Sequence, residues 1–330
     1  MTDMPAQRAV PAKTLTTPST VSPAFAAFMT DMARQPAGSG RVPATPEQWR
    51  GLVAANDALA RPRLAEIRAR FPAEITIREI AGVTVREIVP ASLDSAKAGR
   101  VLMHLHGGGY VIGGGDACAS EGSLGAHYAR TRVISVDYRM PPDHPFPAAL
   151  DDAVSVWRAM SAAHDPASIG AFGTSAGGGL LLAMTHRLKA LGLPLPGALA
   201  PGTPWADLAG EGDSYAVNSF VDGRLPEYDG LMAAMARLYA GGVDLADPLV
   251  SPVHGDFNGF PPSILTTGTR DILLSDTVRV YRRMRAAGVE ARLEVHEAMS
   301  HADYGYAIDS PESATVFNDI ARFFDRRLKG

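Results

Sequence analysis

The alternation of apolar and polar residues from about residue 74 onward predicts a β-sheet. "EITIREI" and "VTVREIV" (74–80 and 83–89) alternate with a period of two around a tight break, which is typical of an antiparallel pair with one solvent-exposed face. Further short runs, mostly β-branched or apolar, read "RVLMHLH", "RVISVDY", "SIGAFG", "GALAPG", "SILTTGT" and "ARLEVHE". The pattern therefore predicts about eight strands.

Helical stretches separate most of these runs, at 146–160, 176–191 and 275–287. Short strands that alternate with helices are typical of a mainly parallel sheet with helices on both faces. One interval is different, because about sixty residues (205–262) lie between two strands. An insertion of that length is commonly a lid or a binding wall.

Two helices are expected before the first strand. The second begins at Thr45, an N-cap followed by Pro46 at the first helical position and Gln48 at the third. Residues 1 to about 20 are polar and contain prolines, so we expect them to be disordered or draped over the surface. The first helix is indicated by one apolar stripe, Phe25, Phe28, Met29 and Met32.

Composition and charge narrow the classes of partner. Of 330 residues, 46% are hydrophobic and 20% are charged, and the formal net charge is −4. This balance gives no basic surface for nucleic acid or anionic lipid, so a small or neutral ligand is expected. Cys118 is the one cysteine, which excludes an intramolecular disulfide and a cysteine-based zinc cluster. The sequence contains no apolar run of signal-peptide or membrane-spanning length, so a cytoplasmic protein without membrane association is expected.

A candidate nucleophile lies in "GAFGTSAGGG". A short apolar strand runs into Gly173-Thr174-Ser175-Ala176-Gly177 and then into a helix, which is the context that a G-x-S-x-G nucleophile elbow requires. The elbow is so tight that a Cβ two residues before or after the serine would strike a neighbouring element. The alternative is an ordinary glycine-rich loop, but the match of motif and context favours Ser175 as a nucleophile.

A serine nucleophile needs a base, which in turn needs an orienting carboxylate. His301 follows the last predicted strand, at the edge where ligands meet open parallel sheets, whereas His296 lies within that strand. Asp271 follows the preceding strand, 30 residues earlier, about one strand–helix–strand crossover. We expect Asp276, one turn into the next helix, to be an ordinary acid near a helix start. The sequence thus predicts Ser175, Asp271 and His301 as a catalytic triad.

A metal or phosphate site is disfavoured by spacing. In "HEAMSH" the histidines are five residues apart, about 140° around a helix, so the H-E-x-x-H zinc pattern is absent. No lysine occurs between Lys97 and Lys189, which excludes a P-loop at the glycine-rich stretch between them. That stretch, "HLHGGGYVIGGG" (104–115), instead offers bare backbone N–H groups that can approach a developing oxyanion. His104 and His106 are expected to hold it by side-chain hydrogen bonds.

Taken together, "HGGGY", "VDYRMPPDHPFPAALDD", "GTSAGG", "TRDILLSD" and the late histidine resemble the hormone-sensitive-lipase-like (bacterial family IV) esterases of the α/β-hydrolase superfamily, in their GTSAG branch. The resemblance runs from about residue 100 to 301. It implies an α/β-hydrolase fold, the same triad, and an oxyanion hole from the backbone N–H groups of Gly108, Gly109 and Ala176. It requires no cofactor and no metal. Thr174, where the family more often has aspartate, and Ala302-Asp303, where it commonly has Gly-Phe, are departures that bear on acyl preference.

The resemblance also implies a cap over the site. Residues 1–50 and 205–255 would form this cap, and 51–204 and 256–330 would form the catalytic domain. The implied function is a carboxylesterase that acts on short- to medium-chain acyl esters, because a bounded cap leaves little room for long lipids. A lactone, carbonate or amide hydrolase with the same triad is an alternative, and a non-catalytic ligand-binding protein is another. The resemblance is also compatible with a homodimer.

Overall fold

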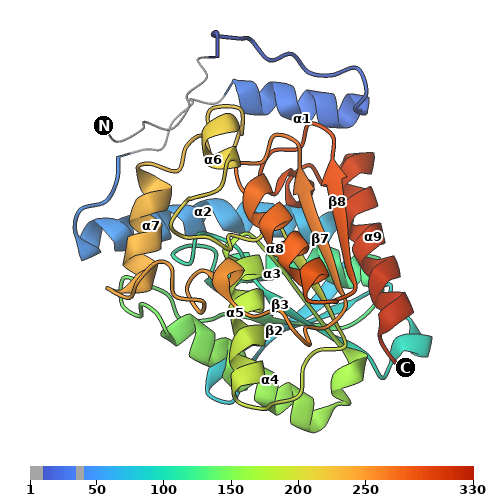
Figure 1. Cartoon of the computed structure of the whole chain (residues 1–330). Helices are drawn as coiled ribbons and strands as arrows, with labels where there is room; N and C mark the ends of the chain where they lie inside the picture. The colour runs from blue at the N-terminus through green and yellow to red at the C-terminus, as the bar shows by residue number, and fades with distance from the viewer. Residues whose placement is uncertain (1–9, 35–40) are drawn as a thin grey trace.

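A computed structural model describes residues 10–34 and 41–330, and within them one sheet of eight strands forms the centre of the molecule (Figure 1). The strand order is β1-β2-β4-β3-β5-β6-β7-β8. β2 pairs antiparallel with both β1 and β4, and all other pairs are parallel. The strands are β1 Ala73–Ile80, β2 Val83–Pro90, β3 Val101–Leu105, β4 Val133–Val136, β5 Ile169–Thr174, β6 Ala198–Gly202, β7 Ser263–Gly268 and β8 Ala291–His296.

The helices of the described residues fall before, between and after these strands. α2 begins at the predicted N-cap, where the Thr45 hydroxyl accepts the N–H of Gln48 at 3.3 Å, and it continues past Pro62 for two more turns. The cap boundary expected at residue 50 therefore falls inside this helix. The helices are α1 Pro23–Ala33, α2 Pro46–Arg70, α3 Ala119–Ala129, α4 Ala148–Ala163, α5 Ala176–Ala190, α6 Ser214–Val217, α7 Leu231–Ala240, α8 Leu274–Ala286 and α9 Pro311–Arg327.

The central strands are buried on both faces, which explains why they read as apolar runs without alternation. Val101, Met103 and Leu105 of β3 pack with residues of α4, α5 and α8, whereas Leu102 packs on the other face with residues of α3 and α9. Successive side chains of a strand point to opposite faces, so one short strand supplies both cores. The predicted mainly parallel sheet with helices on both faces is confirmed.

The carboxyl ends of β5, β6, β7 and β8 meet at one edge of the sheet, because these strands are parallel neighbours. The insertion between β6 and β7 contains α6 and α7. Figure 1 shows α1 and α6 at the end of the molecule toward which β7 and β8 point. Residues 10–20, the first that the structure describes, contain no helix or strand. They are largely exposed, as the sequence predicted. Residues 1–9 and 35–40, which belong to the predicted cap, lie outside the described residues.

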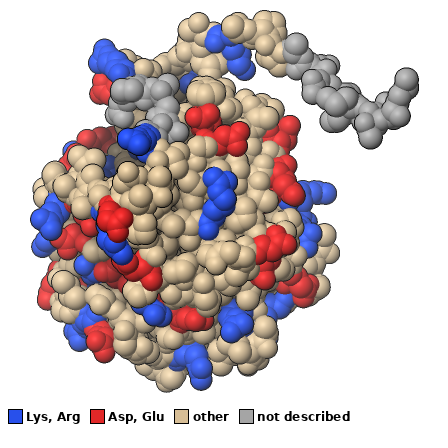
Figure 2. Space-filling view, turned by 90° about the vertical axis from the view of Figure 1, so that its left-hand side faces the viewer, with Lys and Arg blue, Asp and Glu red and all other residues tan. Residues whose placement is uncertain are grey.

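The surface carries both signs of charge. In Figure 2, Lys and Arg are interspersed with Asp and Glu over the face in view. Among the helices of residues 10–34 and 41–330, none combines the length and the apolar character needed to cross a membrane.

Candidate active site

Ser175 lies in the sharp turn between β5 and α5, in a strained backbone conformation. Its φ is 62° and its ψ is −125°, a region that costs a non-glycine residue about 1–3 kcal/mol. The Ser175 N–H donates to the carbonyl of Gly202 at 2.9 Å, and the Ser175 carbonyl accepts from the N–H groups of Gly179 and Trp205, both at 2.9 Å. These backbone bonds hold the turn and present the side chain at the edge of the sheet.

The two flanking glycines of the motif are required by sterics, as the sequence predicted. A Cβ placed on Gly173 or on Gly177 would overlap the carbonyl oxygen of Leu105, at the end of the neighbouring strand β3. Backbone oxygen cannot move aside as the end of a flexible side chain can. The elbow can therefore form only with glycine at both positions.

His301 lies within hydrogen-bond distance of both other predicted triad residues. Its Nε2 is 2.8 Å from the Ser175 Oγ, and its Nδ1 is 3.2 Å from the Asp271 Oδ1. The three side chains come from the turn after β5, the loop after β7 and the loop after β8, and all three reach the same sheet edge. Asp271 and His301 are nearly fully buried. The structure thus brings the three residues into the geometry of a nucleophile, a base and an orienting acid.

The carboxylate of Asp271 is held by donors that the sequence did not single out. It accepts hydrogen bonds from the Thr267 hydroxyl at 2.9 Å, from the Leu273 N–H at 2.8 Å and from the hydroxyl of Thr203. The Thr203 Oγ1 also lies 3.0 Å from the Nδ1 of His301. Thr203 directly follows β6, which lies between the strands of the nucleophile and the acid. Its position after a buried strand at the site edge was the one sequence signal that could have identified it.

The environment of His301 favours its protonated form. Burial lowers the pKa of an imidazole, but the charge and hydrogen bond of Asp271, with a further contribution from the charge of Asp222, outweigh burial and raise the pKa above its usual value. A raised pKa makes His301 a stronger proton acceptor once it is neutral. This is the property that a general base for a serine hydroxyl needs.

The glycine-rich loop after β3 passes beside the nucleophile. A Cβ on Gly107 would lie 3.4 Å from the Cβ of Ser175. Gly108 and Gly109 have φ values of 118° and 61°, which only glycine adopts readily. In the described part of the chain, the N–H groups of Gly108 and Gly109 donate to no other group. Two of the three predicted oxyanion donors, the N–H groups of Gly108 and Gly109, therefore lie uncommitted in a loop next to Ser175, and the third, Ala176, is the first residue of α5.

His106, as a neutral imidazole, holds the base of this loop. Its Nδ1 lies 2.8 Å from the carbonyl oxygen of Gly107, and its ring stacks on Tyr138 with centroids 4.0 Å apart. Burial lowers the pKa of His106 to about 4. The Tyr138 hydroxyl donates to the His106 carbonyl at 2.6 Å. The hydrogen bonds of His106 and Tyr138 both fix the loop, which agrees with the hydrogen-bonding role expected for this histidine.

A buried polar network lies beneath the elbow and includes Thr174, the residue at which the related esterases more often have aspartate. The Thr174 hydroxyl contacts the carboxylate of Glu121 and lies 2.6 Å from the Tyr304 hydroxyl. The other Glu121 oxygen lies 3.2 Å from Nε2 of His104, whose Nδ1 is 2.7 Å from the Ser135 hydroxyl. Thr174 thus links the elbow directly to α3 and to the segment after β8, and the network continues through Glu121 and His104 to β3 and β4.

Asp276 is an anchor for the insertion and not an ordinary surface acid. It is fully buried in the first turn of α8. Its Oδ2 accepts the N–H groups of Ala206 and Asp207, both at 2.9 Å, and the Tyr215 hydroxyl at 3.0 Å. Burial, with the nearby charge of Asp207, raises the pKa of Asp276 well above its usual value. Asp276 thus lies at a helix start, as expected, but its burial was not expected, and it arises because the first residues of the insertion cover it.

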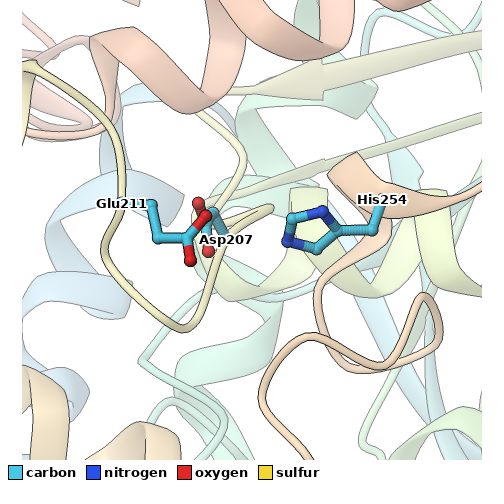
Figure 3. Close-up of side chains that lie close together, drawn as sticks. All are labelled: Asp207, Glu211 and His254. Carbon is cyan, nitrogen blue, oxygen red and sulfur yellow. The ribbon is translucent and has the colours of Figure 1, made fainter.

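One cluster among the described residues has the side chains of a metal site. Asp207, Glu211 and His254 come from the two ends of the insertion and point toward one another (Figure 3). Their ligand atoms lie within 4.8 Å of one another. The Asp207 carboxylate, however, already accepts from the guanidinium of Arg279 and from the N–H of Ala209 at 3.1 Å. Because that ion pair accounts for the buried charge, we assign no metal to the cluster.

Comparison with known proteins places the chain in a family. The sequence model for the alpha/beta hydrolase fold matches residues 102–304. An acetyl-hydrolase of Streptomyces hygroscopicus is 34% identical over 233 residues, which cover 70% of this chain and 77% of the relative. The carboxylesterase NlhH of Mycobacterium tuberculosis is 31% identical over 226 residues, which cover 65% of this chain and 69% of the relative.

Comparison with solved structures leads to the same family. The crystal structure of one esterase superposes with a TM-score of 0.93 at 36% identity and covers 98% of this chain and 99% of its own. An esterase from the bacterial hormone-sensitive lipase family superposes with a TM-score of 0.79 at 30% identity over 93% of this chain and 99% of its own. The chain therefore belongs to the alpha/beta hydrolase fold family, and its resemblance to the hormone-sensitive-lipase-like esterases of that family is confirmed.

Proposed function

We propose that the protein is a carboxylesterase that hydrolyses short- to medium-chain acyl esters through an acyl-enzyme on Ser175. The single observation that carries the proposal is the 2.8 Å approach of the His301 Nε2 to the Ser175 Oγ, with Asp271 on the other ring nitrogen. Names of the relatives support the reaction class, since they are called acetyl-hydrolase, esterase and carboxylesterase.

In the acylation half-reaction, the Ser175 Oγ attacks the ester carbonyl carbon while the His301 Nε2 takes the hydroxyl proton. The carbonyl π electrons move to the oxygen and form a tetrahedral oxyanion. When they return, the bond to the alcohol oxygen breaks and His301 gives its proton to the departing alcohol. Asp271 accepts a hydrogen bond from the Nδ1–H of His301 throughout and stabilises the imidazolium, and the proton stays on the ring.

In the deacylation half-reaction, water replaces the alcohol. His301 takes a proton from the water, whose oxygen attacks the acyl carbon. The bond to the Ser175 Oγ breaks, the serine regains its proton from His301, and the carboxylic acid leaves. Protein groups and water suffice for both halves, so EDTA should not change the rate.

The oxyanion of both intermediates would be stabilised by the N–H groups of Gly108, Gly109 and Ala176. Support comes from the uncommitted N–H groups of the two glycines and from the place of Ala176 as the first residue of α5. A helix N-terminus carries a partial positive charge, which favours an anion there. One such donor is typically worth about a hundred- to a thousandfold in turnover.

We assign the cap to the amino-terminal helices and to the insertion, with segments at 1–50 and 205–255. The side chain of Met235 in α7 supports this assignment, since a Cβ on Gly109 would lie 2.6 Å from the Met235 Sδ. A helix of the insertion therefore packs directly on the glycine-rich loop. This contact bounds the space beside the glycine-rich loop, which favours short and medium acyl chains over long lipids.

The test is hydrolysis of p-nitrophenyl esters from acetate to palmitate, by the wild type, Ser175→Ala and the control Ser161→Ala, with EDTA present. Ser161 is a partly exposed serine whose hydroxyl donates only within α4. We expect the wild type and the control to prefer short chains, and Ser175→Ala to lose roughly 10⁴-fold or more in kcat. Activity retained by folded Ser175→Ala would refute the serine mechanism. Rates that increase steadily toward palmitate would refute the chain-length assignment.

Homodimer formation and a cytoplasmic location stay predictions. Sedimentation of the purified protein tests the first, and fractionation of cells that express it tests the second.

A further inference from the structure

A short turn of the insertion, residues 222–225, docks on the loops of the proposed triad. The buried carboxylate of Asp222 accepts four backbone hydrogen bonds. Oδ1 accepts from the N–H groups of Arg224 at 2.8 Å and Leu225 at 3.1 Å, which closes the turn itself. Oδ2 accepts from the N–H groups of Ile272 at 2.9 Å and His301 at 3.1 Å. One oxygen atom therefore joins the loop after β7 to the loop after β8.

Adjacent residues of the turn bind the histidine loop as well. The Gly223 N–H donates to the Ser300 hydroxyl at 3.0 Å, and the Arg224 Nε donates to the carboxylate of Asp303 at 3.0 Å. The Arg224 guanidinium also lies over the ring of Tyr306, 3.4 Å from its centroid. Asp303 is one of the two residues at which the sequence departs from the Gly-Phe common in the family. Asp303 thus bonds a residue of the insertion with one oxygen and the Ser300 N–H of its own loop with the other.

The insertion binds the acid loop through a second residue. The side-chain amide of Asn218 donates to the carbonyl of Asp271 at 2.8 Å. The Asp222 N–H in turn donates to the carbonyl of Asn218 at 3.0 Å. Asn218 and Asp222 therefore form one unit that contacts the main chain on both sides of the site.

The four acceptor bonds require an ionised carboxylate, because a protonated oxygen would point its own hydrogen at an N–H group. The titratable groups whose charges act on Asp222 are Asp271 and His301, whereas the Arg224 guanidinium bonds the carboxylate of Asp303. Burial, followed by the charge of Asp271, raises the pKa of Asp222 to about 6, against the opposing effects of His301 and the N–H donors. The carboxylate is thus ionised at neutral pH, and its negative charge contributes to the raised pKa of His301.

We infer that Asp222 is a positioning residue that fixes the separation of the loops carrying Asp271 and His301, so that the triad geometry depends on a docked insertion. The side chain of Asp222 bonds only main-chain N–H groups of these loops and touches no reacting atom. Displacement of reacting groups by about 1 Å can cost on the order of a hundredfold in rate. The inference rests on the function proposed above.

The test is Asp222→Asn, which keeps the size of the side chain but offers one acceptor oxygen and turns an NH₂ group toward two N–H donors. We expect kcat for p-nitrophenyl acetate to fall roughly tenfold to a hundredfold, with KM nearly unchanged. The acidic limb of the pH profile of kcat/KM should also move to lower pH, because a charge that raises the pKa of His301 is gone. A merely structural residue would not move this limb. The matched control is Asp213→Asn, an exposed acid of the same insertion whose side chain makes no cap hydrogen bond.

Wild-type kcat and an unmoved acidic limb in folded Asp222→Asn would overturn the inference. If that variant fails to fold by circular dichroism, Asn218→Ala decides, because it breaks the bond to the acid loop and removes no charge. It should lower kcat and leave the acidic limb in place, and wild-type kcat in Asn218→Ala would then overturn the inference. The two proposals fail separately: an active Ser175→Ala refutes the triad, whereas an inactive Ser175→Ala beside a wild-type-like Asp222→Asn refutes only the role of Asp222.

Discussion

The nucleophile elbow and the docking turn at 222–225 both hold triad residues in place, but they do so in different ways. The elbow can be recognised within five consecutive residues, because the two glycines and the strained φ of Ser175 all fall there, although it is the backbone of β3 that excludes the two Cβ atoms. The docking turn acts through Asp222, whose partners Ile272 and His301 are 50 and 79 residues away in sequence. A steric requirement leaves a motif in the sequence. A carboxylate that accepts main-chain N–H groups leaves none, since any loop offers such donors.

The largest expected difference in kcat is between variants of Asp271, in the loop after β7, and of Asp276, in the first turn of α8. Asp271→Asn should lower kcat by roughly 10⁴-fold, because the amide favours the wrong tautomer of His301. Asp276→Asn should lower kcat far less, because Asp276 bonds to Ala206 and Asp207 of the insertion and acts on the histidine only through the docking of that insertion. Steady-state kinetics on p-nitrophenyl acetate measure both.

The reverse order of these two effects would contradict the assignment of the acid. A large loss in Asp276→Asn alone would place the orienting carboxylate on α8. Equal losses in both variants would mean that the anchor of the insertion is as important as the acid, and would remove the distinction between local and long-range support.

A smaller effect is expected at Thr203, which supports the site from β6 and has no motif of its own. Thr203→Val removes one hydroxyl donor from Asp271 and leaves the Thr267 hydroxyl and the Leu273 N–H as donors. A hydrogen bond to a charged group is worth about 1.5–3 kcal/mol, and the remaining donors should limit the loss in kcat to roughly tenfold. The control is Thr185→Val, a buried threonine that bonds only within α5. Equal rates in the two variants would show that Thr203 has no part in holding the acid.

The fold could be predicted from sequence because the periodicity reflects burial directly. All eight strands were expected within about two residues of their observed bounds, since β3, β5, β6 and β7 are buried along their whole length. The carboxyl-terminal end of α2 was harder to predict from the sequence. Pro62 suggests a break, but the helix continues to Arg70, because tertiary packing overrides the local cost of a proline.

The site could be predicted in part, for the same physical reason. Ser175, Asp271 and His301 each follow a recognisable strand, and parallel strands bring their ends to one edge, where the structure places these side chains within hydrogen-bond reach. Their catalytic roles stay predictions. Thr203 and Asp222 were missed because their function depends on which segments fold against each other. The burial of Asp276 was not predicted because it comes from the insertion and not from its own helix.

The most direct measurement is covalent inactivation by an alkyl fluorophosphonate as a function of pH, with the modified residue located by peptide mass spectrometry. The account predicts stoichiometric modification of Ser175. It also predicts a rate that falls as the pH drops through the raised pKa of His301, with a midpoint above 6.5, because only the neutral imidazole can accept the serine proton. Modification at another residue, or a rate at Ser175 that does not depend on pH around this midpoint, would contradict it.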